Sequence, residues 1–203
     1  MAWIPIALSR DIPTGTTRAV VLEGRELVAW RSGSGALQVW EDRCPHRGMR
    51  LSFGFVRGEA LNCLYHGWQY GTGSSCQRIP AHPDLEVPNT IKAKAFAAAE
   101  SGGLVLVNLA AAGPAPELPK AMPVASVAVN ASAGAILALC AEAPRGDAQL
   151  FGATLDGIPF QIGWHEVMAN KTMLHAGIAG SDPRSALAAL HQLRAEAERN
   201  VAA

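Results

Sequence analysis

The sequence has no excess charge of either sign, because its 17 Lys and Arg residues are balanced by 17 Asp and Glu residues. Binding to nucleic acid or to an anionic membrane surface depends on a large basic patch. The balance argues against both classes of partner, so a protein partner would be recognised through local charge. Only 17% of the residues are charged and 49% are hydrophobic, which is ample for a packed core.

Long hydrophobic runs are missing as well. No apolar stretch approaches the roughly 18 residues of a membrane-spanning helix. The start of the chain, Met1 to Pro5, lacks the basic residues, the apolar stretch and the cleavage site of a secretory signal. We therefore expect a soluble, cytoplasmic protein.

Cysteine is scarce, with four residues at positions 44, 63, 76 and 140. They could form two disulfides, but an intracellular chain with a core of this size neither needs disulfides nor keeps them easily. Metal ligation is the better interpretation for at least two of the four.

The first half of the chain consists of short β segments separated by Gly, Ser or charged residues. Apolar runs that predict strands lie at 19–22, 27–30, 37–40, 61–64, 91–99 and 104–107. We expect an all-β domain over residues 1–109. Residues 110–123 hold four prolines and a glycine, which predicts a linker and a domain boundary.

Residues 124–203 predict a small α+β domain. Apolar segments that predict strands lie at 124–130, 135–141 and 149–155, followed by a hairpin of 158–167 with 172–179 that turns at 169–171. A helix closes the chain. Asp182 is its expected N-cap and Pro183 its first residue, and its leucines at 187, 190 and 193 are expected to pack on the second sheet.

One motif pairs cysteine with histidine twice. Cys44 and His46 form a C-x-H arm, Cys63 and His66 form a C-x-x-H arm, and sixteen residues separate His46 from Cys63. A hairpin over 53–61 would bring the two arms together. One cysteine and one histidine per loop is the arrangement of a Rieske two-iron, two-sulfur cluster, in which the cysteines hold one iron and the histidines hold the other.

This mixture of ligands has a chemical consequence. Neutral imidazoles add no negative charge and so raise the reduction potential above that of all-cysteine clusters. The second nitrogen of each imidazole can take up a proton, which couples proton uptake to reduction. A tetrahedral zinc site is the alternative, since two cysteines and two histidines are a common zinc set. The C-x-H arm, together with glycines at 48 and 67 that suit close backbone approach, favours the cluster.

Residues 1–109 resemble the Rieske domain of ring-hydroxylating and demethylating oxygenases. The resemblance runs from Trp3-Ile4-Pro5 through the Cys-Pro-His-Arg-Gly motif at 44–48 to Ile79-Pro80-Ala81. It implies a Rieske fold, an antiparallel β-sandwich with two cluster-binding loops. It also implies that the cluster is held by Cys44, His46, Cys63 and His66 and is neighboured by Arg47, Gly48, Tyr65, Gly67, Trp68, Tyr70 and Pro80.

The resemblance also distinguishes subtypes. Respiratory Rieske proteins carry an extra cysteine in each loop, where this sequence has Met49 and Tyr65, so no disulfide can join the loops. Trp68 replaces a hydroxyl side chain that donates to the cluster in the respiratory type, whereas Tyr70 keeps the next aromatic hydroxyl. Fewer hydrogen bonds imply a low potential for this class, on the order of −150 mV.

Other residues near the motif have two interpretations each. Arg43, Arg47 and Arg50 form either a basic collar for an acidic reductase or ferredoxin, or an ordinary solvated loop. Cys76 and His82 are expected to have packing or surface roles rather than to bind metal.

A complete Rieske oxygenase adds a helix-grip domain whose iron is held by two histidines and a carboxylate. The element order of 124–203 resembles a remnant of that domain, but the later histidines lack the family's spacing. If the hairpin turn uses three residues, His165 and His175 face each other and could hold a mononuclear Fe(II), with Asp156 or Glu166 near. The alternative places both histidines on the solvent side of an edge hairpin. Cys140, in a predicted strand, is expected to be a small core residue.

These observations predict an electron-transfer protein of the oxygenase class. The resemblance implies a reductase or ferredoxin as donor, an oxygenase chain or a small-molecule substrate as acceptor, and a homo-oligomer, with a trimer as the expectation. The second domain would serve docking or assembly. Two alternatives stay open: a compact oxygenase with its own iron at His165 and His175, and a redox sensor whose partner affinity follows the cluster's oxidation state.

Overall fold

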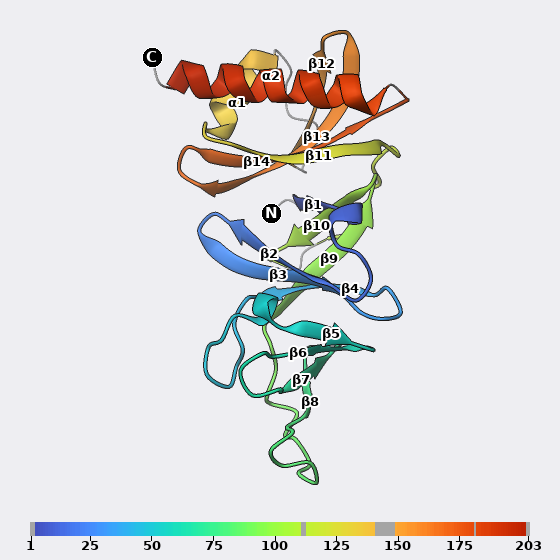
Figure 1. Ribbon diagram of the computed structural model, residues 1–203, viewed down its shortest axis with the longest axis vertical. Helices are drawn as coiled ribbons and strands as arrows, with labels where there is room; N and C mark the ends of the chain where they lie inside the picture. Colours follow the sequence, from blue (N-terminus) through green and yellow to red (C-terminus); the bar gives the residue numbers. More distant parts are fainter. Residues whose placement is uncertain (1–2, 111–112, 141–148, 181, 202–203) are drawn as a thin grey trace. The chain divides into compact units, whose positions relative to one another are not determined.

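The computed structural model describes residues 3–110, 113–140, 149–180 and 182–201 and is mainly antiparallel β (Figure 1). The chain forms two compact units that interleave along the sequence. The first unit comprises residues 11–21 and 25–98, and the second comprises 1–10, 22–24 and 99–203. No helix in the described ranges is long and apolar enough to span a bilayer.

The predicted boundary at 110–123 follows chain order, whereas the two units interleave. The division into a domain at 1–109, a linker at 110–123 and a domain at 124–203 therefore stays a prediction. A short 3-10 helix, Ser9–Asp11, links β1 (Ile4–Leu8) to the first unit along the chain.

The first unit contains two antiparallel groups of strands. β2 (Thr17–Leu22), β3 (Arg25–Arg31) and β4 (Leu37–Glu41) lie side by side, and β4 also pairs with the start of β9 (Ala95–Ser101). After a 3-10 helix, Leu51–Phe53, a four-stranded meander follows. Its strands are β5 (Phe55–Arg57), β6 (Ala60–Asn62), β7 (Gln69–Gly71) and β8 (Cys76–Arg78).

The core of the first unit is built around two tryptophans. Trp30 and Trp40 are fully buried, and their rings meet edge to face with centroids 4.9 Å apart. Such aromatic pairs add stability beyond the area they bury. The same cluster of buried side chains includes Cys44, Cys63 and Tyr70, so the candidate ligand loops rest directly on the core.

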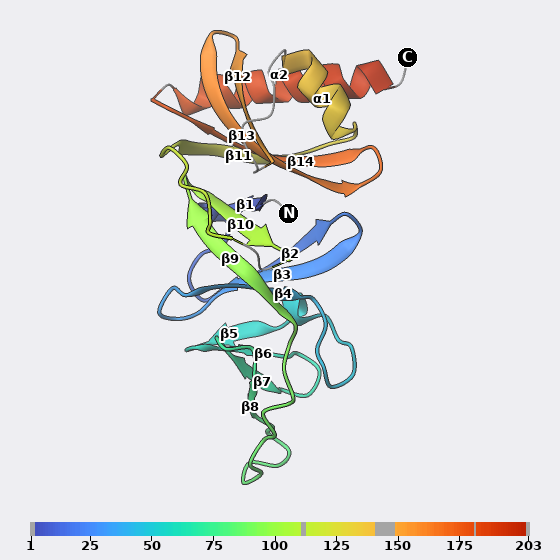
Figure 2. The ribbon, with the colours of Figure 1, turned by 180° about the vertical axis from the view of Figure 1, so that it is seen from behind.

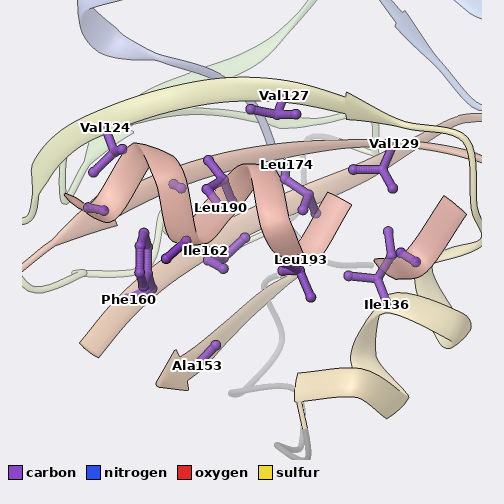
Figure 3. Packing of buried hydrophobic residues seen from close by; sticks show 14 of the residues in the cluster. Val124, Val127, Val129, Ile136, Ala153, Phe160, Ile162, Leu174, Leu190 and Leu193 are labelled. Atoms are coloured by element: carbon purple, nitrogen blue, oxygen red, sulfur yellow. The ribbon is translucent and has the colours of Figure 1, made fainter. Parts of the chain in front are cut away.

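The second unit has its own sheet, in the order β11-β14-β13-β12, covered on one face by helices (Figures 1 and 2). Its elements are β1, β10 (Leu104–Asn108), β11 (Met122–Val129), α1 (Ala133–Cys140), β12 (Leu150–Leu155), β13 (Ile158–Met168), β14 (Lys171–Ile178) and α2 (Pro183–Val201). Figure 3 shows Leu190 and Leu193 of α2 among Phe160, Ile162 and Leu174 of the sheet. This apolar layer anchors the C-terminal helix.

The predicted hairpin at 158–179 is confirmed. β13 and β14 pair antiparallel and turn through Ala169 and Asn170, with Asn170 in the left-handed region at φ 55°. A register shift between Glu166 and Met168 adds a bulge next to the turn.

The prediction of a strand at 135–141 was wrong, because these residues form helix α1. The oxygen of the Ser132 side chain accepts a hydrogen bond from the Ala135 backbone N–H at 3.3 Å, which caps the first turn. A short apolar run cannot be assigned to strand or helix by periodicity, and the alanines here favour helix. Cys140 accordingly ends a helix and is half-buried, rather than lying in a core strand.

The predicted start of the last helix is confirmed. The Asp182 carboxylate accepts hydrogen bonds from the backbone N–H groups of Arg184 and Ser185, and Pro183 is the first helical residue. The expected burial of Leu187 was wrong, since it is 38% exposed. The buried residues of α2 form one stripe along the helix, and Leu187 lies about 100° around the helix axis from the middle of that stripe. The buried residues of α2 are Ala186, Ala189, Leu190, Leu193 and Ala197.

Strand β1 lies against the face of the second sheet opposite the helices. It pairs antiparallel with β10, with a register shift between Pro5 and Ala7. Gly163 of β13 makes the close approach possible, because a Cβ there would lie 2.6 Å from Pro5 Cβ and 3.1 Å from a methyl carbon of Leu104. A glycine is therefore needed where β1 crosses the sheet.

We predict that Gly163→Ala lowers the free energy of unfolding by about 1–3 kcal/mol, because the added methyl group overpacks the contact with Pro5. The matched control is Gly134→Ala in α1, where a Cβ meets nothing within 4 Å. That change should leave stability unchanged or raise it by up to about 1 kcal/mol. Urea denaturation of the full chain checks both, and a Gly163→Ala midpoint at or above the unchanged protein would contradict the packing argument.

Candidate metal-cluster site

The first candidate ligand loop follows β4 and is closed by two main-chain hydrogen bonds. The Cys44 N–H donates to the Met49 carbonyl at 2.8 Å, and the Gly48 N–H donates back to the Cys44 carbonyl at 2.8 Å. Between them the chain turns through Pro45, His46 and Arg47. The loop therefore has a defined shape before any metal is considered.

The second loop repeats this construction directly after β6. The Cys63 N–H donates to the Trp68 carbonyl, and the Gly67 N–H donates to the Cys63 carbonyl, both at 2.9 Å. The glycine stands four residues after the cysteine in both loops, although the histidine stands two residues after Cys44 and three after Cys63. The two loops are thus equivalent in backbone and differ in where the imidazole leaves the turn.

The two glycines are required for this shape. Gly48 and Gly67 have φ values of 72° and 70°, in the left-handed region that other residues rarely adopt. A Cβ would also meet the Arg43 side chain at 3.2 Å in the first loop and the Pro80 ring at 3.1 Å in the second. Pro80, predicted as a neighbour of the cluster, thus lies over the second loop.

A buried aspartate that the motif does not contain supports the first loop. Asp42 is 3% exposed, and its two carboxylate oxygens accept from the Ser52 backbone N–H at 2.7 Å and the Ser52 hydroxyl at 2.5 Å. This joins the loop to the 3-10 helix at Leu51–Phe53. Sequence reasoning missed Asp42, and its position directly between a strand and the motif was the available signal.

The two thiols lie in the interior. Cys44 and Cys63 are 3% and 2% exposed. Burial raises the pKa of the Cys63 thiol, and the neighbouring Cys44 raises it further. The Tyr70 hydroxyl lies 3.2 Å from Cys44 Sγ, and burial, followed by this contact, raises the pKa of Tyr70. A tyrosine that keeps its proton donates to the sulfur when that sulfur is a thiolate.

The two imidazoles lie nearer the surface. His46 is half-buried and His66 is exposed, with ring centroids 4.8 Å apart. The Trp68 indole stacks on His46 at 4.1 Å with only 6° between the planes, and Tyr65 covers His66 at 3.8 Å. Partial burial lowers the pKa of His46, and the nearby His66 and Arg47 lower it further.

This donor set fits a two-iron cluster. Sulfur donors lie inside and nitrogen donors lie outside, so the two kinds of ligand are segregated as a cluster with unlike irons requires. The thiols rest on the core and the imidazoles are held by aromatic rings, so each kind of ligand has its own support. Such a group could exchange an electron through its imidazole side, where protein covers it least.

The other cysteine and histidine of this region lie as expected. Cys76 is buried opposite Tyr70 in the β7–β8 pair, and its Sγ donates to the Arg78 carbonyl at 3.6 Å. Burial raises the pKa of Cys76. His82 is exposed in the turn that begins at Ile79.

The predicted collar of arginines is only partly available. Arg50 forms an ion pair with Glu26, a partner 24 residues earlier in the chain. Arg43 and Arg47 are exposed, and Arg43 lies against Gly48. The first loop therefore offers two of the three predicted arginines to a partner.

The expectation that His165 and His175 lie on the solvent side was wrong, since they are 2% and 1% exposed. β1, which lies more than 150 residues earlier, covers the sheet face that carries them, and the Pro5 carbonyl lies 2.9 Å from His165 Nδ1. His175 Nε2 lies 3.2 Å from His165 Nδ1, and Ser126 Oγ lies 2.9 Å from His175 Nδ1. An Nδ1–H on each ring satisfies these contacts with both imidazoles neutral.

His165 and His175 lie close together, but the hairpin does not have the predicted three-residue turn. The turn has two residues and a bulge, so His165 lies opposite Met173 and His175 lies opposite Gly163. Asp156 is exposed in the β12–β13 turn, and Glu166 lies opposite Thr172. Across the described ranges, no three His, Cys, Asp or Glu side chains are placed to hold one metal ion. A second metal at this pair stays a prediction.

Residues 2–90 match the family model described as the Rieske [2Fe-2S] domain. Among curated proteins, the chain is 41% identical over 108 residues to oxidoreductase NdmD of Pseudomonas putida, covering 53% of this chain and 18% of that protein. It is 36% identical over 120 residues to the oxygenase subunit of 3-chlorobenzoate-3,4-dioxygenase from Comamonas testosteroni, covering 58% and 28%. The matched region thus spans less than a third of the length of these relatives.

Solved structures extend the likeness to the second unit. Apo dicamba monooxygenase matches with a TM-score of 0.76 at 16% identity, covering 98% of this chain and 85% of that chain. NdmA of Pseudomonas putida with caffeine matches with a TM-score of 0.71 at 19% identity, covering 98% and 80%. At these identities the likeness concerns the fold, and it includes the part of the chain beyond residue 109.

We predict that Tyr70→Phe lowers the reduction potential of a bound [2Fe-2S] cluster by about 40 mV. The reason is that a hydrogen bond to a ligand sulfur stabilises the more negative, reduced state by about 1 kcal/mol relative to the oxidised one. The substitution removes the hydroxyl 3.2 Å from Cys44 Sγ and keeps the buried ring. Redox titration followed by visible absorbance checks it, with Tyr65→Phe, whose side chain is exposed, as the control. An unchanged or higher potential in Tyr70→Phe would argue against the donor role.

Proposed function

We propose that the chain has a role of the Rieske oxygenase type and that this role is electron transfer, because residues 2–90 are a Rieske [2Fe-2S] domain homologous to those of Rieske oxygenases. Its cofactor is a [2Fe-2S] cluster. In this proposal the protein passes single electrons from a reductase or ferredoxin to a mononuclear-iron oxygenase centre. The observation that carries it is the pair of matched loops, which present buried thiols and outward imidazoles from one rigid unit.

We assign Cys44 and Cys63 to one iron and His46 and His66 to the other. The assignment is supported by the equal backbone closure of the two loops and by the segregation of sulfur and nitrogen donors. When bound, such a cluster accepts and returns one electron at a time. No other residue in the described ranges is needed to complete the ligand set.

The surrounding side chains would hold this site in one geometry. Trp68 fixes the plane of His46 by stacking, and Tyr65 does the same for His66. The Tyr70 hydroxyl would donate to a Cys44 thiolate, and the thiols pack in the same buried cluster as the tryptophan pair. Little rearrangement is then needed when the charge changes, which is the condition for rapid electron exchange.

Because His66 is exposed, an electron would have only a short distance to cross between the cluster and a docked protein. Its ring lies at the surface, and Leu64 and Tyr65 beside it are 57% and 58% exposed. Exposed apolar side chains around a redox site favour transient docking of another protein. A homo-oligomer, with a trimer as the expectation, and a cytoplasmic location stay predictions.

The principal alternative is a compact oxygenase with its own iron at His165 and His175. The 3.2 Å separation of their nitrogens is compatible with two ligands on one ion. A facial triad also needs a carboxylate and open coordination positions, and the pair is 1–2% exposed. A redox sensor is a further alternative, in which the cluster state changes affinity for a partner.

We predict two irons and two acid-labile sulfides per chain, with a Rieske-type visible spectrum and an electron-spin signal on reduction. Cys63→Ala and His66→Ala should lose the cluster, because each removes one of four ligands. His191→Ala, an exposed histidine on α2, should keep it. Metal and sulfide quantification of the full chain provides the measurement.

The iron count separates the alternatives. Three irons per chain, with loss of one in His175→Ala, would favour the compact oxygenase over electron transfer alone. A colourless protein that contains zinc and no acid-labile sulfide would contradict the proposal. Turnover of a partner oxygenase on addition of the reduced protein would argue against a sensor.

A further inference from the structure

A pocket of about 250 Å³ opens in the first unit beside the first candidate ligand loop. The sequence motif does not predict this pocket, because the pocket is formed by two segments about 50 residues apart. Its lining residues are Glu41, Arg43, Cys44, Pro45, Gly48, Lys92 and Lys94. Three bases and one acid give the lining a net charge of +2, in a chain whose total charge is zero.

The basic side chains stand on fixed backbone. Lys92 and Lys94 belong to the segment that precedes β9, where the Glu41 N–H donates to the Lys94 carbonyl at 2.8 Å. Lys92 also forms a β-bridge with Ser75. Arg43 follows β4 by two residues and lies against Gly48 of the first ligand loop. The positions of the charges are therefore set by strand pairing rather than by a free loop.

The pocket lining holds one acid, and that acid has a partner. Glu41 lies 3.9 Å from the Lys94 ammonium, which also lies 5.6 Å from the centre of the Phe96 ring. The charges of Arg43 and Lys92 exceed what the lining acid can balance. Both side chains are exposed, so their field extends into solvent. A carboxylate is the chemical group that two such cations would attract.

Apolar side chains exposed on the two candidate ligand loops point to a protein rather than a small ion. Pro45 lines the pocket and is exposed, and Leu64 and Tyr65 at the tip of the second loop are more than half exposed. An apolar patch with a charged rim is the composition of a protein interface. A free oxyanion would use the cations and leave the apolar side chains in water.

We propose that this pocket receives a carboxylate side chain of an acidic electron-donor protein and thereby orients the donor on the cluster loops. The inference rests on the proposed function, since it names the partner of the same site. It revises the predicted collar: Arg43 acts from the pocket together with Lys92, while Arg50 is paired with Glu26. In a chain without net charge, such a local pair of cations supplies the steering of the encounter.

The test compares Lys92→Glu with Arg184→Glu in the full, cluster-loaded chain. Both residues are exposed and both changes alter the net charge equally, but Arg184 lies on α2, outside the pocket lining. The probe is a prereduced plant-type [2Fe-2S] ferredoxin of strongly negative net charge, whose potential lies below that of Rieske centres. Stopped-flow absorbance gives the second-order rate constant of cluster reduction at several salt concentrations.

Lys92→Glu should slow reduction by the ferredoxin about tenfold at low salt and flatten the salt dependence, because steering is lost. Lys92→Gln should fall between it and the unchanged protein, and Arg184→Glu should match the unchanged protein. Equal slowing in Arg184→Glu and Lys92→Glu would overturn the proposal, since net charge alone would then explain the rates.

Small redox ions separate this docking role from a shift in potential. Oxidation of the reduced protein by ferricyanide should slow in Lys92→Glu, while oxidation by hexaamminecobalt(III) should quicken, whereas a changed potential would move both rates in one direction. A ferricyanide effect without a ferredoxin effect would identify a small-anion site and overturn the protein partner. A normal cluster spectrum with unaltered rates in Lys92→Glu would refute this inference alone, whereas absence of the cluster would refute the proposed function.

Discussion

The whole site depends on one pair of main-chain contacts, repeated in each loop, that closes a turn between a cysteine and the residue five positions later. The Cys44 and Cys63 N–H groups donate across their loops, and a left-handed glycine donates back to each cysteine carbonyl. These bonds fix where the thiols and imidazoles leave the backbone, so the candidate ligands are positioned by local geometry. The stacked tryptophan, the tyrosine hydroxyl and the buried aspartate then act on positions that the turns have already set.

Much of the first unit could be predicted because its signals are local. The spacing of cysteine and histidine, the glycines that permit the left-handed turns, and the short apolar runs all act over a few residues. The hairpin at 158–179 and the N-cap at Asp182 were predictable for the same reason. The helix at Ala133–Cys140 was not predicted, because the periodicity of a short apolar run does not separate a buried strand from a buried helix, and its alanines and the Ser132 cap were not given weight.

Features that depend on distant residues could not be predicted from the motif. Arg50 was predicted to belong to the basic collar, but it forms an ion pair with Glu26 of β3. Lys92 belongs to no motif, yet its bridge to Ser75 and the hydrogen bond of the neighbouring Lys94 to Glu41 place it in the lining of the same pocket as Cys44. The charge available around the candidate site thus depends on tertiary pairing, whereas the candidate ligands are recognised by their spacing in the sequence.

The buried histidine pair bears on the choice between electron transfer and an oxygenase with its own iron. Burial of a polar ring needs hydrogen-bond partners, and a metal is only one way to satisfy it. Here Pro5 and Ser126 supply partners, and His175 Nε2 lies within hydrogen-bond distance of His165 Nδ1. The bulge between Pro5 and Ala7 in β1 lies where the Pro5 carbonyl turns toward His165, so the contact belongs to the packing of β1 on the sheet. The burial of the pair is therefore compatible with a packing role for both rings, and it does not by itself call for a second iron.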